Sequence, residues 1–192
     1  DLDPKELPVG EADGTGIPIR GIKKRGQELK VFIQKKKRGG VRIAGLSIGK
    51  YDAGWDELFA PLRDTIMSFK NFLLVTDGDS SIFKGMKCVN VILQRCLWHI
   101  PHQLKHCLWS DKVKRKSGEW LEIMGKIYDI VSIRQHLEED EIDAVLREKR
   151  TRLDGLISLC EQRGRMGCAS YLINARPDMF TAMEKRLNGR AS

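Results

Sequence analysis

Two short apolar runs in the middle of the chain, residues 72–75 and 89–93, limit the folds that this sequence can adopt. Short continuous runs bounded by polar or turn-forming residues are typical of buried central strands. The first run is followed at once by Thr76 and Asp77. A polar residue just past the C-terminal end of such a strand is well placed for chemistry. The sequence therefore predicts two buried strands and a candidate metal-binding carboxylate at Asp77.

The residues before these runs predict three more strands and a helix. Residues 9–20 have extended character broken by glycines and a proline, residues 29–34 alternate apolar and polar side chains, and residues 41–49 form a third run. From residue 52 the apolar residues recur at helical spacing. A helix between the third and fourth strands is the crossover that a parallel pair requires, so we expect an antiparallel meander extended by parallel strands.

The remainder of the chain is predicted to be helical. We expect a short helix up to about residue 87, a helix over 96–109 that either begins near Pro101 or is kinked there, and further helices over 120–131, 138–160 and 178–187. This order is that of an α/β, ribonuclease-H-like fold: a mixed five-stranded sheet with flanking helices, followed by an all-α insertion. The expected divisions are a tether at 1–7, a catalytic core at 8–110, a helical insertion at 111–175 and the start of a return to the core at 176–192.

The balance of charge suggests a polyanionic partner. Lysine and arginine number 34 against 26 acidic residues, which gives a net charge of +8 and a pI near 9.3. Nucleic acid is the simplest such partner, although a basic protein can also carry its lysines only for solubility. The candidate phosphate-binding residues lie in two predicted turns: Lys23, Lys24 and Arg25 in the first, and Lys35, Lys36, Lys37 and Arg38 in the second.

Five cysteines, an odd number without dense spacing, favour reduced thiols and an intracellular location, which in a bacterium would be the nucleoid-containing cytoplasm. No apolar run has the length of a membrane span, and we expect no membrane association. The chain opens without an initiator methionine, so we interpret it as an excerpt of a longer protein.

A second carboxylate, Asp13, lies on the first predicted strand. In a ribonuclease-H-like sheet the first strand lies beside the fourth, so Asp13 and Asp77 could converge. Carboxylates that converge on two divalent ions are what two-metal phosphoryl transfer requires, and Mg²⁺ prefers such oxygen ligands. The alternative is that both residues serve turns, because each is followed by glycine.

Four motifs carry a family resemblance: E-A-D-G-T-G-I-P at 11–18, G-W-D-E-L at 54–58, L-L-V-T-D-G at 73–78 and Q-R-C-L-W-H at 94–99. Together they resemble the catalytic domain of the Mutator-like DDE transposases, which include a large bacterial insertion-sequence family. The similarity covers about half of the chain, from residue 11 to residue 106. A ribonuclease-H-like core with a helical insertion before the last catalytic residue is what the resemblance implies.

The resemblance also implies chemistry and partners. Two aspartates and one glutamate would bind Mg²⁺ or Mn²⁺, cut double-stranded DNA at the ends of an element and join them to a target, with the protein assembled as a homo-oligomer on the DNA. Asp13 would be the first acid and Asp77 the second. The third acid is either Glu184, which basic residues follow, or a residue beyond this excerpt, in which case the chain alone would be inactive.

Cys96 and His99 match the C-x2-H signature of that family. A cysteine and a histidine at this spacing can chelate zinc, with His102, His106 and Cys107 as further ligands. A solvated or DNA-facing histidine surface is the favoured interpretation, because no second pair of ligands is present. Trp98 and Trp109 could stack on an unpaired base, but packing in a core or interface is favoured.

Three competing functions remain open at this level. A ribonuclease-H-like nuclease would cut DNA without joining it and would not need a long helical insertion. A non-enzymatic DNA-binding or assembly module derived from a transposase would lack the third acid. A zinc-dependent interaction domain would require metal at Cys96 and His99.

Overall fold

The computed structural model describes residues 1–18, 27–51, 53–134 and 137–187. These residues form two compact units, Asp1–Gln94 and a second unit from Arg95 onward, and each unit has its own apolar core. We call them the sheet unit and the helical unit. The predictions made for Lys23, Lys24 and Arg25 lie outside the described residues.

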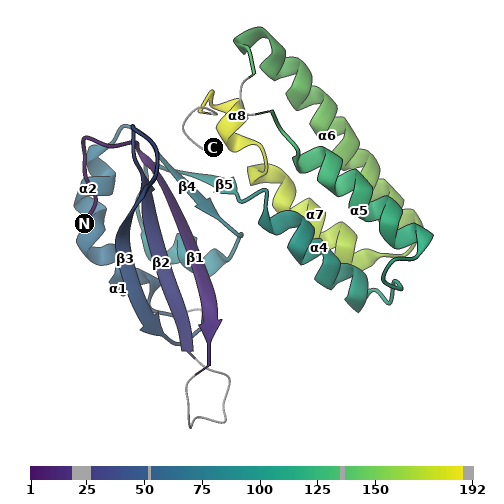
Figure 1. Cartoon of the computed structure of the whole chain (residues 1–192), viewed down its shortest axis with the longest axis horizontal. Helices are drawn as coiled ribbons and strands as arrows, with labels where there is room; N and C mark the ends of the chain where they lie inside the picture. The colour runs from purple at the N-terminus through teal and green to yellow at the C-terminus, as the bar shows by residue number, and fades with distance from the viewer. Residues whose placement is uncertain (19–26, 52, 135–136, 188–192) are drawn as a thin grey trace. The chain divides into compact units, whose positions relative to one another are not determined.

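The sheet unit contains a five-stranded mixed sheet in the order β3-β2-β1-β4-β5 (Figure 1). Its strands are β1 Val9–Ile17, β2 Gln27–Lys35, β3 Val41–Gly49, β4 Phe72–Thr76 and β5 Val91–Arg95. Strand β2 pairs antiparallel with both β1 and β3, whereas β1 and β4 are parallel. The prediction of an α/β fold with a mixed five-stranded sheet and flanking helices is confirmed.

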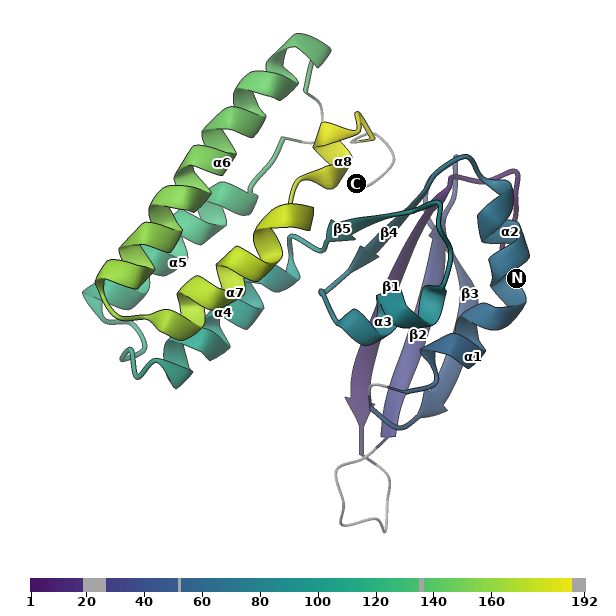
Figure 2. The same ribbon diagram turned by 180° about the vertical axis from the view of Figure 1, so that it is seen from behind.

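Three short helices cover one face of this sheet, as Figure 2 shows from behind. They are α1 Trp55–Phe59, α2 Arg63–Ser68 and α3 Ser80–Met86, and a 3-10 turn, Ala60–Leu62, joins the first two. Phe59 lies edge-on to Phe32 of β2, with ring centroids 5.1 Å apart, and stacks on Trp55 at 5.7 Å. A Cβ at Gly85 would lie 2.5 Å from Trp55 Cβ, so a glycine is what lets α3 approach α1 this closely.

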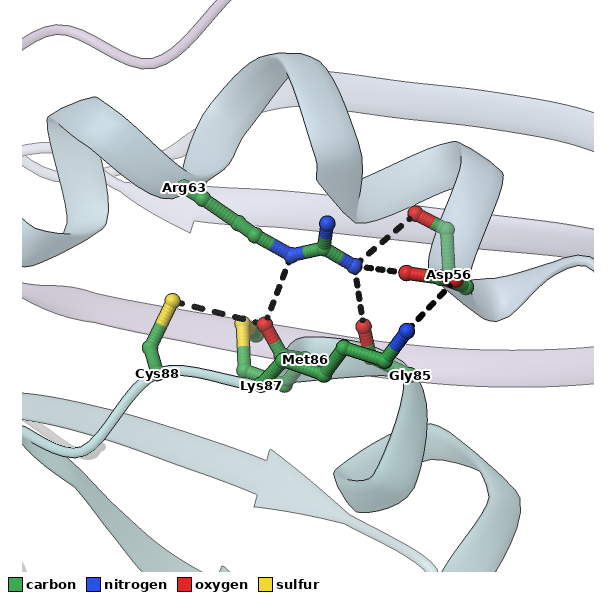
Figure 3. A network of polar contacts seen from close by, with 6 residues as sticks. All are labelled: Asp56, Arg63, Gly85, Met86, Lys87 and Cys88. Carbon is green, nitrogen blue, oxygen red and sulfur yellow. Dashed lines mark hydrogen bonds and ion pairs between the residues drawn. The ribbon is translucent and has the colours of Figure 1, made fainter.

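A network of polar contacts joins α1, α2 and the end of α3 (Figure 3). Arg63 donates to the carbonyl oxygens of Met86 (3.1 Å) and Gly85 (2.9 Å) and pairs with the Asp56 carboxylate. Lys87 Nζ donates to the same carboxylate at 2.7 Å. The hydrogen bonds from Lys87 and Arg63 hold the pKa of Asp56 below its usual value. One guanidinium thus supplies partners for carbonyls that the helix end leaves unpaired.

Polar residues are built into the covered side of β2. Lys30 is fully buried; its Nζ pairs with Glu28 and donates to the Lys50 carbonyl at 2.8 Å. Gln34 is also fully buried and exchanges hydrogen bonds of 2.9 Å with the backbone of Asp3. The segment predicted as a tether, 1–7, is therefore attached to the sheet through Asp3.

Strand β5 begins two residues later than the predicted run. Val89 is 91% exposed, and the side chain of Asn90 donates to the carbonyls of Ile66 and Phe69 instead of facing a core. Asn90 therefore closes the end of α2, and the strand starts after it, at Val91.

The helical unit is built from α4 His99–Ser110, α5 Gly118–Val131, α6 Glu139–Gln162 and α7 Met166–Ala175, followed by a 3-10 turn, Arg176–Asp178, and α8 Thr181–Glu184. Each of the helices α4 to α7 packs on the next one along the chain, and α7 also packs on α4. The four helices thus surround one core (Figure 1). Pro101 lies in the first turn of α4, where its missing N–H would have no partner in any case, so the helix begins near it and is not broken.

Two predicted boundaries differ from the structure. The predicted core ended at residue 110 and included α4, but α4 packs on α5 and α7 in the helical unit because Ile100, Leu104 and Leu108 contribute to that core. The predicted last helix is reduced to α8, since Lys185 ends it. No helix in the described ranges is long and apolar enough to cross a membrane.

Candidate functional site

The pairing of β1 with β4 places the two predicted acids next to each other. The parallel register runs from Val9 opposite Leu73 to Ala12 opposite Thr76, and Asp13 and Asp77 are the next residue on each side. Neighbouring strands lie about 4.8 Å apart, and residues in parallel register share a face of the sheet. The topology therefore brings two carboxylates, sixty-odd residues apart in sequence, to one level of the sheet.

The backbone after β4 fixes the position of Asp77. The Asp79 N–H donates to Asp77 Oδ1 at 2.9 Å, and the Gly78 N–H donates to Thr76 Oγ1 at 3.1 Å. Gly78 has a φ of 100°, which favours glycine. Asp79 then caps α3 by accepting from the Ser81 N–H at 2.8 Å. Thus the D-G-D-S-S segment forms a turn and cap, and one oxygen of Asp77 already accepts a backbone hydrogen bond.

Asp13 lies on the sheet face opposite α1–α3, and Asp77 follows the end of β4 at Thr76. Ala12 and Phe32 are in the covered core, whereas the residues that alternate with them line a shallow depression on the other face: Glu11, Asp13, Thr15, Leu29, Val31 and Ile33. Asp13 is half-buried there. Glu11 was not among the acids predicted from the sequence, although residues two apart on a strand share a face. That spacing alone indicates a second carboxylate beside Asp13.

Of the three predicted acids, the sheet brings Asp13 and Asp77 to the same level. Among the described residues there is no group of three histidine, cysteine or acidic side chains that could hold a metal ion. Glu184 lies on α8 of the helical unit, where its carboxylate pairs with Arg150 of α6. A metal ion at Asp13 and Asp77 would thus take these two carboxylates and water as its ligands, as Mg²⁺ commonly does.

The Cys96 and His99 pair forms the turn that opens α4. The His99 N–H donates to the Cys96 carbonyl at 3.1 Å, and the Trp98 ring lies edge-on to the His99 ring with centroids 4.8 Å apart. Of the other candidate zinc ligands, His102 is exposed and stacks on Trp98. Burial raises the pKa of the Cys107 thiol, which disfavours the thiolate that zinc would require.

The second basic turn is the β2–β3 hairpin. Its loop is closed by hydrogen bonds between Lys36 and the two following glycines, Gly39 and Gly40, which both have positive φ. Lys37 and Arg38 are exposed at the tip, while Lys35 and Lys36 are half-buried. Two exposed cations at the end of a rigid hairpin can contact a polyanion without rearrangement of the sheet.

Trp98 and Trp109 do not pack in a core. They are 65% and 74% exposed, so neither packs in a core, while packing in an interface stays a prediction. The reason is their position on α4: the apolar stripe of that helix, Ile100, Leu104 and Leu108, occupies the opposite side.

Comparisons with known proteins identify no relative of this chain: no family model, no curated protein and no solved structure matches it significantly.

Proposed function

We propose that this chain is the catalytic domain of a DDE-type DNA transposase, with a ribonuclease-H-like sheet unit and a helical insertion. The strand order, an antiparallel β1–β3 meander with β4 added parallel to β1, is that of ribonuclease-H-like folds. The four sequence motifs support the family. The observation that carries the proposal is the position of Asp13 on β1 and of Asp77 just after β4, each one residue beyond the last registered pair of these parallel strands.

In this proposal Asp13 and Asp77 bind Mg²⁺ or Mn²⁺ on the open face of the sheet. The metal ions would activate a water or a 3′-hydroxyl for attack on a DNA phosphate and stabilise the leaving oxygen. The Asp79 N–H donates to one carboxylate oxygen of Asp77, and this hydrogen bond orients the carboxylate for the metal. Lys37 and Arg38 on the hairpin tip, with Lys35 and Lys36, would hold DNA phosphates. A third acid and a second protomer complete the assembly.

The test is Asp77→Asn in the complete protein, assayed for cleavage and strand transfer on a DNA fragment in Mg²⁺ buffer. We expect strand transfer to fall by at least about a thousandfold, because the amide loses the charge that holds the metal. Asp79→Asn is the matched control, since it changes the helix cap and leaves the metal ligand intact. Strand transfer retained by Asp77→Asn would refute the assignment, and cleavage without joining by the wild type would indicate a nuclease.

A second function is favoured by one observation. The described residues hold no three-acid group, and Glu184 is paired with Arg150. A transposase-derived module that binds or organises DNA without cutting it would have this arrangement. Glu184→Gln separates the two functions: loss of strand transfer in the complete protein makes Glu184 the third acid, whereas unchanged DNA binding in a protein that never cuts favours the module.

A further inference from the structure

The solvent-facing side of α4 carries two aromatic rings in line. Trp98 immediately precedes the helix and Trp109 lies near its end. Eleven residues at 100° each bring them to within about 20° of each other around the axis, and roughly 16 Å apart along it. Both rings are mainly exposed, which costs hydrophobic free energy in the isolated chain.

Basic and polar side chains accompany the two rings. The His102 ring lies 4.3 Å from Trp98, tilted by 33°. The Lys112 Nζ lies 5.7 Å from the centre of the Trp109 ring. Lys105, on the same side of the helix, lies 5.7 Å from the ring of Tyr128 on α5, which is 45% exposed. We call this surface the α4 stripe: Trp98, His102, Lys105, Trp109, Lys112 and the basic residues Lys114, Arg115 and Lys116.

The stripe differs in charge from the rest of the helical unit. In the rest of the unit several arginines are matched by acids, in the pairs Arg163–Glu122, Arg165–Glu119, Arg176–Asp154 and Arg186–Asp143. No ion pair joins a described residue to the lysines or the arginine of the stripe. The nearest acid in sequence, Asp111, is occupied, because its carboxylate accepts from the Gly167 and Cys168 N–H groups at 3.0 and 2.9 Å. The stripe therefore presents uncompensated positive charge beside exposed rings.

We propose that the α4 stripe binds single-stranded nucleic acid. Unpaired bases stack on Trp98 and Trp109, and the intervening phosphates contact Lys105, Lys112 and the residues at 114–116. Aromatic platforms combined with cations are the general means of holding unpaired strands, because every base has a face on which a ring can stack. A separation of roughly 16 Å corresponds to about five stacked nucleotides at 3.4 Å each.

The pattern is less suited to other partners. A lipid surface or an amphipathic helix would need a continuous apolar face, whereas here the rings are separated by His102 and Lys105. The binding rests on the α4 contacts alone. Its assignment to DNA strands that become unpaired during cleavage at element ends rests on the proposed function.

The experiment measures binding of the full chain to a fluorescently labelled oligo-dT of twenty nucleotides and to a blunt duplex of equal length, by anisotropy at low salt. We expect Trp98→Ala and Trp109→Ala each to weaken binding of the single strand by roughly 5- to 150-fold, because each removes one stacking platform. Tryptophan fluorescence of the wild type should be quenched on binding. Changing Lys112, Lys114, Arg115 and Lys116 together to glutamine should reduce the salt dependence by about 0.7 per lost phosphate contact.

Leu121→Ala and Met166→Ala are the matched controls, because both side chains are mainly exposed apolar residues of the same unit outside the stripe. Both variants should bind as the wild type does. Unchanged binding by the two tryptophan variants, or no binding of oligo-dT by the wild type, would overturn the proposal. So would tryptophan-dependent binding to anionic phospholipid vesicles without binding to oligo-dT.

The same measurement on Asp77→Asn separates this proposal from the function of the sheet unit. The variant should lose strand transfer and keep oligo-dT binding. If oligo-dT binding depends on the tryptophans but strand transfer does not depend on Asp77, the proposal for the α4 stripe holds and the transposase assignment is refuted. Strand transfer that depends on Asp77 but not on the tryptophans would refute the role of the stripe in cleavage at element ends.

Discussion

The two units solve the same packing problem in opposite ways. In the helical unit the apolar stripes of four helices face one another and the arginines pair with acids at the surface. In the sheet unit helices cover one face of the sheet, and the other face is open along β3, where Val41, Ile43, Leu46 and Ile48 are 48% to 62% exposed. The two units also differ in the polar residues that they bury. Among the described residues the helical unit buries Lys149, and the sheet unit buries Glu28, Lys30, Gln34, Thr76 and Gln94.

This difference shows where each unit has room for function. Among the described residues of the helical unit, Trp98 and Trp109 are the most exposed large apolar side chains, which makes them candidates for binding. A sheet with one open face exposes the side chains that alternate with its core, and the acids Asp13 and Glu11 lie among these. In the sheet unit the candidate site follows from the strand topology. In the helical unit it follows from the solvent-facing side of α4.

The largest effect is expected from breaking the buried pair of the sheet unit. Lys30→Ala leaves Glu28 buried without its cation, and the free energy of unfolding should fall by about 3–5 kcal/mol. The measurement is urea unfolding followed by circular dichroism. The double variant Glu28→Leu, Lys30→Met is the control, and it should recover most of the loss because no charge remains buried. Equal losses in both would show that the hydrogen bond to Lys50, and not the charge pair, is the main contribution.

The next effect compares one leucine from each unit. Leu153 of α6 is fully buried, so Leu153→Ala should lower the free energy of unfolding by about 2–5 kcal/mol. Leu46 of β3 is 61% exposed on the open face, and Leu46→Ala should cost less than about 1 kcal/mol. A loss at Leu46 as large as that at Leu153 would mean that the open face is covered in solution.

The smallest effect concerns pH. Lys87 and Arg63 lower the pKa of Asp56, so the ionised carboxylate is stabilised in the folded state. This contribution is fully present above the unfolded value near 3.8 and is lost as the pH falls through the lower folded pKa. The difference in thermal midpoint between the wild type and Asp56→Asn should therefore shrink between pH 6 and pH 3. It should also shrink at high salt, since Asp56 is half exposed. A difference independent of pH would assign the loss to the helix geometry instead.

Much of the candidate site was predictable from the sequence because it depends on element order. Once residues 9–20 and 72–76 were assigned as strands, a sheet in which the first lies beside the fourth placed Asp13 next to Asp77. Glu11 could have been found by the same alternation. Glu184 could not be placed, because its pairing with Arg150 depends on how α8 meets α6.

The sequence by itself determined the periods: two for the strands, three to four for the helices, and hence the order of elements and the pair of acids. Only the tertiary structure decided which side of each element is covered. Strand β2 alternates correctly, yet its apolar side, Leu29, Val31 and Ile33, faces the open depression, while Glu28, Lys30 and Gln34 are buried. Helix α4 likewise leaves both tryptophans outside. The physical reason is that a charged residue can be buried when neighbouring elements supply a carbonyl or a counter-ion as its partner. The periodicity of the local sequence contains no information about those partners.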